Sequence, residues 1–153
     1  MQENAMLRNL VLFGLSLLAA GCGVPEEDPE AAIRAWVARG EAAAEEKDRS
    51  TLIDMISVDY ADARGNDRDE IGDLLRLYFF RQQSIALLTS IDNISLSGET
   101  AALVTLTVGM AGTEGGALGL RADAYNFEFE LEKANDDWLL IGARWSELGG
   151  RLH

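Results

Sequence analysis

The fold is indicated most clearly by the stretch Asp123-Ala124-Tyr125-Asn126-Phe127-Glu128-Phe129-Glu130-Leu131-Glu132. From Tyr125 onward, aromatic and aliphatic side chains alternate with polar and acidic ones. Successive side chains of a β-strand point to opposite faces of a sheet, so this alternation predicts a strand with one buried and one solvated face. Asp123 falls on the same face as the apolar residues.

Three other segments share this strand-like composition, and turn residues separate all four. The turns are predicted at Ser97-Gly98, in the glycine-rich stretch 112–119, and at Asn135-Asp136-Asp137. Short connections of this kind join neighbouring antiparallel strands. The sequence therefore predicts a four-stranded antiparallel meander with strands from Ile85 to Leu96, Ala101 to Met110, Ala122 to Leu131 and Trp138 to Trp145.

The first predicted helix precedes these strands. Asp28 is suited to the N-cap, and Pro29 to the first helical position. Apolar or small residues then recur at helical spacing at Ile33, Trp36, Val37, Gly40 and Ala44. Charged residues are expected on the other faces, at Arg34, Arg39, Glu41, Glu45 and Glu46. The pattern indicates an amphipathic helix of about five turns.

Two shorter helices are predicted before the strands. One carries Leu52, Ile53, Met55 and Ile56 and is followed by an extended stretch over residues 58–63. The other begins with a capping box, formed by Asp67 and by Glu70 three residues later. Helices followed by an antiparallel sheet indicate the α+β class.

This order of elements over residues 29–148 resembles the nuclear-transport-factor-2-like superfamily, also called SnoaL-like. The resemblance includes the tryptophan-bearing first helix, the stretch Asp59-Tyr60-Ala61-Asp62, the aromatic third helix and the final strand from Trp138 to Trp145. It implies that three N-terminal helices pack into the concave side of a curved antiparallel sheet, as a cone with an apolar cavity. Members of the superfamily include isomerases, dehydratases, cyclases and non-catalytic binding modules, so the resemblance alone does not select a function.

The candidate catalytic residues are carboxylates and a tyrosine. Histidine chemistry is excluded, because the only histidine is His153 at the end of the chain. If Asp123 lies on an apolar wall, desolvation disfavours its ionised form and raises its pKa toward neutrality, which would suit a catalytic base. The alternative is that Asp123 lies in water at the start of its strand and has no catalytic role. Tyr60 and Asp62 point to the same side of their extended stretch, where they could supply a phenol donor and a carboxylate acceptor for catalysis. The alternative is that Tyr60 is a packed lid residue and that Asp62 is a solvated charge on a loop.

The aromatic residues exceed what a plain core needs, and some are expected to line a ligand pocket: Tyr60, Tyr78, Tyr125, Phe127 and Trp145. Arg121 and Arg144 could bind an anionic ligand, but surface pairing with acidic neighbours is favoured. The glycines of 112–119 lack the lysine and following helix of a phosphate-binding loop. No cofactor and no metal site is predicted, since the acidic clusters lack calcium-loop spacing.

Composition limits the partners of the protein. There are 13 basic and 26 acidic residues, a net charge of −13. Phosphate backbones would be repelled, so nucleic acid is not an expected partner. The length after the leader suits one domain, over residues 29–153, and the single cysteine leaves no internal disulfide.

The start of the chain resembles the signal peptide of a bacterial lipoprotein. A short apolar run ends in Leu17-Leu18-Ala19-Ala20-Gly21, directly before Cys22, as in a lipobox. The commonest form has leucine where Ala19 stands. Residues 1–21 are therefore expected to be the leader, with either Met1 or Met6 as its start; Met6 gives the cleaner leader, because Glu3 is out of place in a positive region.

The resemblance implies that Cys22 is acylated and that residues 22–28 form a short tether. The six residues between Cys22 and the first helix, 23–28, reach roughly 20 Å when extended, so the domain is expected to stay close to the bilayer. Gly23 after the cysteine favours the periplasmic face of the outer membrane.

Three functions are compatible with these observations. The leading hypothesis is a non-catalytic lipoprotein that binds a small apolar ligand or an envelope protein. The alternatives are a cofactor-free isomerase or dehydratase that uses a pocket carboxylate and a tyrosine, and a dimeric structural accessory of the envelope with a filled cone.

The lipid assignment predicts the effect of Cys22→Ser. Because the acidic domain has no electrostatic attraction to an anionic bilayer, the variant should leave the membrane fraction, whereas wild type remains in it. Fractionation of cells expressing each protein measures this. A Cys22→Ser variant that still sediments with membranes would show that the lipid is not the anchor.

Overall fold

The computed structural model describes residues 28–114 and 120–152, and in it three helices precede four strands. The helices are α2 (Pro29–Glu45), α3 (Arg49–Asp54) and α4 (Arg68–Arg81). The strands are β1 (Gln82–Ser97), β2 (Ala101–Glu114), β3 (Leu120–Ala134) and β4 (Asp137–Glu147). They form one antiparallel sheet in the order β1-β2-β3-β4, which confirms the predicted meander and the α+β class.

Local sequence explains where the helices begin. The Asp28 side chain accepts a hydrogen bond from the Glu30 N–H at 3.0 Å, and Pro29 occupies the first turn of α2. The predicted capping box of α4 is present, with Asp67 and Glu70 each accepting from the other's backbone N–H at 2.9 Å. The α4 helix passes directly into β1 at Gln82.

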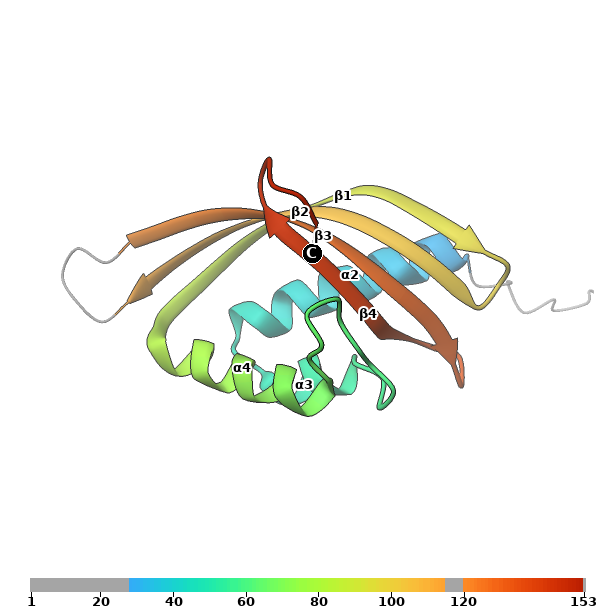
Figure 1. The fold of residues 1–153 in the computed structure, drawn as a ribbon, viewed down its shortest axis with the longest axis horizontal. Coiled ribbons are helices and arrows are strands. Elements are labelled where there is room, and N and C mark those ends of the chain that lie inside the picture. Colours follow the sequence, from blue (N-terminus) through green and yellow to red (C-terminus); the bar gives the residue numbers. More distant parts are fainter. Residues whose placement is uncertain (1–27, 115–119, 153) are drawn as a thin grey trace, which may run out of the picture.

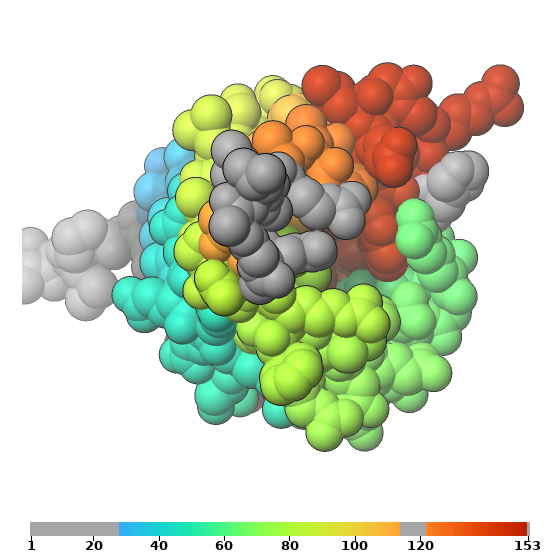
Figure 2. All heavy atoms as spheres, turned by 90° about the vertical axis from the view of Figure 1, so that its left-hand side faces the viewer, coloured from blue at the N-terminus to red at the C-terminus, as the bar shows by residue number. Residues whose placement is uncertain are grey.

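The sheet is an arch, and all three helices lie on its concave side (Figure 1). Register shifts between Ile91 and Asn93 in β1, and between Glu130 and Leu131 in β3, mark bulges that increase the local bend of a sheet. In the space-filling view, α4 forms an outer layer between α2 and the segment that joins α3 to α4 (Figure 2).

The strands are longer than their apolar patterns predict. The apolar residues mark only the part of each strand that faces the helices, and the hairpins continue beyond it through backbone pairing. At the far end of β1 and β2, for example, the Ser84 and Thr113 hydroxyls are 2.7 Å apart and hydrogen-bonded, although both strands are polar there. Hydrophobic periodicity therefore underestimates a strand that extends past the core.

The free edge of β4 is covered by residues 55–63. The Ser57 N–H donates to the Leu140 carbonyl at 2.9 Å, and the Leu140 N–H donates to the Met55 carbonyl at 2.9 Å. Further along, the Ala63 N–H donates to the Ala143 carbonyl at 3.2 Å. The segment predicted to be extended thus satisfies backbone groups that an open sheet edge would expose.

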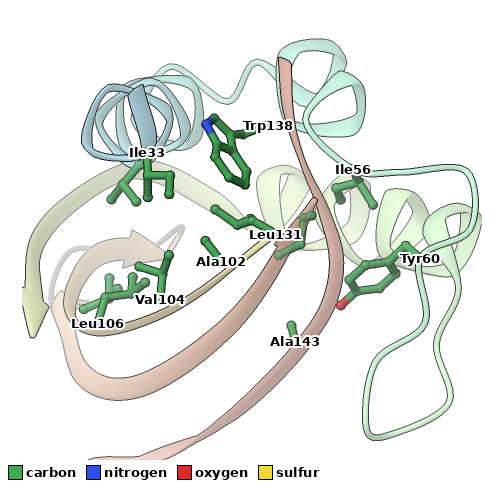
Figure 3. Packing of buried hydrophobic residues seen from close by; sticks show 12 residues of the cluster. Ile33, Ile56, Tyr60, Ala102, Val104, Leu106, Leu131, Trp138 and Ala143 are labelled. Carbon is green, nitrogen blue, oxygen red and sulfur yellow. The ribbon is translucent and has the colours of Figure 1, made fainter. Parts of the chain in front are cut away.

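One hydrophobic cluster joins the helices to the sheet. Its most completely buried side chains are Ile33 of α2, Val104 of β2 and Leu131 of β3, at 0%, 0% and 1% exposure. Figure 3 shows them together with Ala102, Leu106 and Trp138 between α2 and the strands. None of the described helices is both long and apolar enough to span a bilayer.

Leu131→Ala tests whether this cluster holds the fold together. Removing a fully buried leucine side chain should lower the free energy of unfolding by about 2–5 kcal/mol, measured by urea denaturation. The control is Leu88→Ala, because Leu88 is 78% exposed on β1 and its loss should change stability by less than about 0.5 kcal/mol. Equal losses in the two variants would contradict this assignment of the core.

Candidate ligand-binding cavity

A cavity of about 360 Å³ lies between the helices and the concave face of the sheet. Its walls come from α2, α3, α4, the segment after α3 and all four strands. The lining is almost wholly apolar and includes the sulfur side chains of Met55 and Met110. The sequence-based expectation of an apolar cavity in this fold therefore corresponds to a space present in the structure.

The residue sizes on α2 explain where the cavity opens. The first half of the helix carries Ile33, which is fully buried in the core, and then Trp36 and Val37, which pack against the core and form one wall of the cavity. The second half presents Gly40 and Ala44 to the cavity. A Cβ at Gly40 would lie 3.2 Å from the Met55 Cε, so the missing side chain also leaves room for Met55.

Three of the five residues predicted for the pocket line this cavity: Tyr60, Phe127 and Trp145. Tyr78 and Tyr125 are half-buried but do not line it. Tyr78 packs against Phe79 with ring centroids 6.2 Å apart, and Tyr125 packs against Phe127 at the same distance. Neither tyrosine lines the cavity itself, although Tyr125 pairs with Val108, which does.

Tyr60 and Asp62, predicted as a pair, are brought together. Tyr60 is 4% exposed, and its ring reaches from the segment after α3 toward β4 (Figure 3). Burial, followed by the charge of Asp62 and a hydrogen bond to its side chain, raises the pKa of Tyr60 well above its ordinary value. The phenol therefore stays protonated throughout the physiological range.

The expectation that Asp62 is a solvated loop charge is wrong, because Asp62 is only 8% exposed. Its Oδ1 accepts from the backbone N–H groups of Arg64 and Asn66, both at 2.9 Å, and its Oδ2 accepts from the Asn66 side-chain amide at 2.8 Å. With Tyr60 as a further partner, the carboxylate is used to organise the turn over residues 62–66. The same turn places the Arg64 guanidinium 4.3 Å from the centroid of the Trp145 ring.

Asp123, the other candidate base, is exposed and does not line the cavity. It pairs with the lining residue Met110 near the end of the β2–β3 hairpin, but its own side chain is not part of the lining. Of the two environments considered for Asp123, the exposed position agrees with solvent at the start of the strand and not with an apolar wall. Arg144 forms an ion pair with Glu128 on the outer face of the sheet, which is the surface pairing expected for it.

Sequence reasoning missed two polar residues of the lining, Glu41 and Thr89, and it did not assign the aromatic residue Trp36 to the pocket. Glu41 was expected on a face of the first helix other than the apolar one, and in the structure it is half-buried and borders the cavity. Its position one turn after Val37 was the available signal.

The described part of the chain offers no metal centre: within residues 28–114 and 120–152, no three His, Cys, Asp or Glu side chains are grouped as ligands. Cys22 and His153 lie outside the described residues.

Several solved structures share this architecture. A proposed scytalone dehydratase from Novosphingobium aromaticivorans has a TM-score of 0.72 and 14% identity, covering 77% of this chain and 83% of that one. A nuclear transport factor 2-like superfamily protein from Salmonella enterica serovar Typhimurium has a TM-score of 0.66 and 13% identity, covering 78% and 90%. An NTF2-like protein of unknown function in nutrient uptake from Rhodospirillum rubrum has a TM-score of 0.62 and 19% identity, covering 75% and 97%.

The domain therefore has the nuclear-transport-factor-2-like fold, as the resemblance in the sequence predicted. At these identities the similarity defines the fold alone, and the neighbours include both enzymes and proteins of unknown function. No protein-family model and no curated protein matches the sequence.

The Tyr60 environment predicts a pH-dependent stability difference between wild type and Tyr60→Phe. At neutral pH the variant should lose about 1 kcal/mol, the usual value of one hydrogen bond. The folded-state pKa is raised, so this contribution is fully present below the unfolded pKa of about 10 and is lost as the pH rises through the folded value. Urea denaturation from neutral pH to above pH 10 should therefore show the difference shrinking.

Tyr125→Phe is the control for removal of a hydroxyl group, since Tyr125 does not line the cavity. A Tyr60→Phe difference that stays constant up to the highest pH would show that the phenol proton is not held by the fold.

Proposed function

We propose that this domain binds a small, mainly apolar molecule in its cavity and does not transform it. The observation that carries the proposal is the cavity itself, about 360 Å³ and lined by aliphatic, aromatic and methionine side chains. That volume lies within the range of pockets that enclose small ligands. An empty apolar space of this size is costly for a domain, and a ligand that fills it restores the lost contacts.

The lining also includes two methionine side chains, Met55 and Met110. Met55 and Met110 would adapt the wall to the ligand's shape, because methionine side chains are flexible and polarizable.

The electrostatics favour binding over proton transfer. A general base at neutral pH needs a pKa near the working pH and a lone pair directed at the substrate. The pKa of Tyr60 is raised, which moves it away from neutrality, and the oxygens of Asp62 accept bonds from Arg64, Asn66 and Tyr60. The pair is suited to holding the wall and presenting a fixed phenol oxygen, so the isomerase or dehydratase alternative receives less support. The third hypothesis, a structural accessory whose cone is filled by side chains, also receives less support, because the cone contains a cavity.

We also propose that acylated Cys22 holds the domain on the periplasmic face of the outer membrane. The support is the lipobox-like pattern before Cys22 and the position of α2, which begins at Pro29, only seven positions after the cysteine. The cavity would then lie near a source of apolar molecules.

Filling the cavity should abolish binding. Val108 is 7% exposed on β2 and lines the cavity, so Val108→Phe places a larger ring in the space. The neutral apolar dye N-phenyl-1-naphthylamine should gain fluorescence with a single class of sites in wild type and bind at least about tenfold more weakly to the variant.

The control is Leu88→Phe, which adds a ring on the exposed surface of β1 and should leave dye binding unchanged. Urea denaturation establishes that both variants are folded. Wild type that shows no saturable dye binding, or a Val108→Phe variant that binds as wild type does, would refute ligand binding in this cavity.

A further inference from the structure

Almost the whole surface that faces the cavity is apolar. The indole Nε1 of Trp36 is covered by protein atoms, and the Tyr60 hydroxyl is hydrogen-bonded to the Asp62 side chain. Glu41 and Thr89 border the cavity, but with so little polar surface in the lining they contribute chiefly carbon atoms. An occupant therefore meets hydrocarbon and thioether groups rather than hydrogen-bond donors or acceptors.

The peptide groups behind this wall are occupied as well. Strand β2 supplies Leu106, Val108 and Met110 to the lining and is paired with β1 on one side and with β3 on the other. Val108 lies opposite Thr89 in this ladder, and Leu106 lies opposite Phe127. Because the N–H and C=O groups of a central strand bond to its neighbours, the backbone leaves few hydrogen-bonding groups for a ligand.

Such a wall discriminates against polar atoms inside it. A hydroxyl or carbonyl group that leaves water and finds no new partner lowers the affinity of its ligand about five- to hundredfold. An alkyl or aryl group loses no hydrogen bond and gains dispersion contacts with the wall. The cavity therefore selects for hydrocarbon over any group that needs a hydrogen bond.

The volume limits the size of the occupant. An apolar cavity of about 150 Å³ is enough for one benzene molecule. The cavity in this domain, at about 360 Å³, is about 2.4 times as large, which by the same ratio corresponds to a body of about ten to fourteen carbon atoms. A longer ligand must extend through the opening.

We infer that the cavity takes the hydrocarbon body of its ligand, about ten to fourteen carbon atoms without a hydrogen-bonding group, and that any polar end of the ligand stays outside the opening. This inference rests on the proposed binding function and specifies the chemical class and the size of the ligand. It also separates this cavity from the site of a dehydratase, whose substrate brings a hydroxyl group to an acid inside the pocket.

Two isomeric alcohols test the exclusion of polar atoms. In 1-decanol the hydroxyl group is terminal and can remain in solvent, whereas in 5-decanol it lies near the middle of the chain and must enter the cavity with it. The two molecules have the same number of carbon atoms, so their hydrophobic contributions are closely matched. Isothermal titration of the purified full chain at neutral pH should give at least about tenfold tighter binding of 1-decanol. Equal affinities would overturn the inference.

The size limit is tested with the 1-alkanols from 1-hexanol to 1-tetradecanol. Affinity should rise about fourfold with each added methylene group and level off at about twelve carbon atoms, where the chain fills the cavity. Ala44→Leu enlarges a side chain of the lining and should lower this limit by about two to three carbon atoms. The matched control is Ala42→Leu, the same change at an exposed position of α2, which should leave the limit unchanged.

Urea denaturation establishes that both variants are folded. The inference fails if affinity keeps rising to 1-tetradecanol in wild type, if Ala44→Leu leaves the limit unchanged, or if the neutral dye binds and neither decanol does. In each of these cases saturable binding of the dye leaves the binding function standing. If neither the dye nor the alcohols bind, both the inference and the binding function fail.

Discussion

The packing of α2 against the concave face of the sheet is the interaction on which the rest of the structure depends. Ile33 lies fully buried against Val104 and Leu131 in the cluster that joins the helix to the central strands. Register shifts interrupt the pairing of β1 with β2 and of β3 with β4, and a bent sheet can bury its inner face only around something convex. The amphipathic helix supplies that convex surface, and α3 and α4 then close the space beside it.

The same helix determines how much of the concave face is filled. Ile33 near its start completes the core, Trp36 and Val37 form a wall shared by core and cavity, and the small residues Gly40 and Ala44 leave the cavity open. Core and cavity are thus two consequences of one gradient of side-chain volume along α2.

The Tyr60–Asp62 pair shows how a polar group can serve a cavity without doing chemistry in it. Asp62 fixes the turn that brings Arg64 against Trp145, and it holds the Tyr60 phenol at the wall. All of these contacts are local in the chain except the one to Trp145. A carboxylate whose oxygens already accept hydrogen bonds from its own turn has fewer lone pairs left to direct at a substrate.

The sequence by itself determined the elements, their order and the meander, because strand alternation, helix caps and turn residues are local signals. The capping box at Asp67, the N-cap at Asp28 and the turn at Asn135 were all readable in this way, and the pairing of Tyr60 with Asp62 followed from their shared parity. Only the tertiary structure decided which side chains meet inside the arch. Asp123 and Tyr125 share the face of Phe127 and pair with the lining residues Met110 and Val108, yet neither of them lines the cavity, whereas Glu41 of α2 borders it. Periodicity reports which face of an element is apolar, but where along that face a cavity begins and ends depends on volumes contributed by residues far apart in the chain.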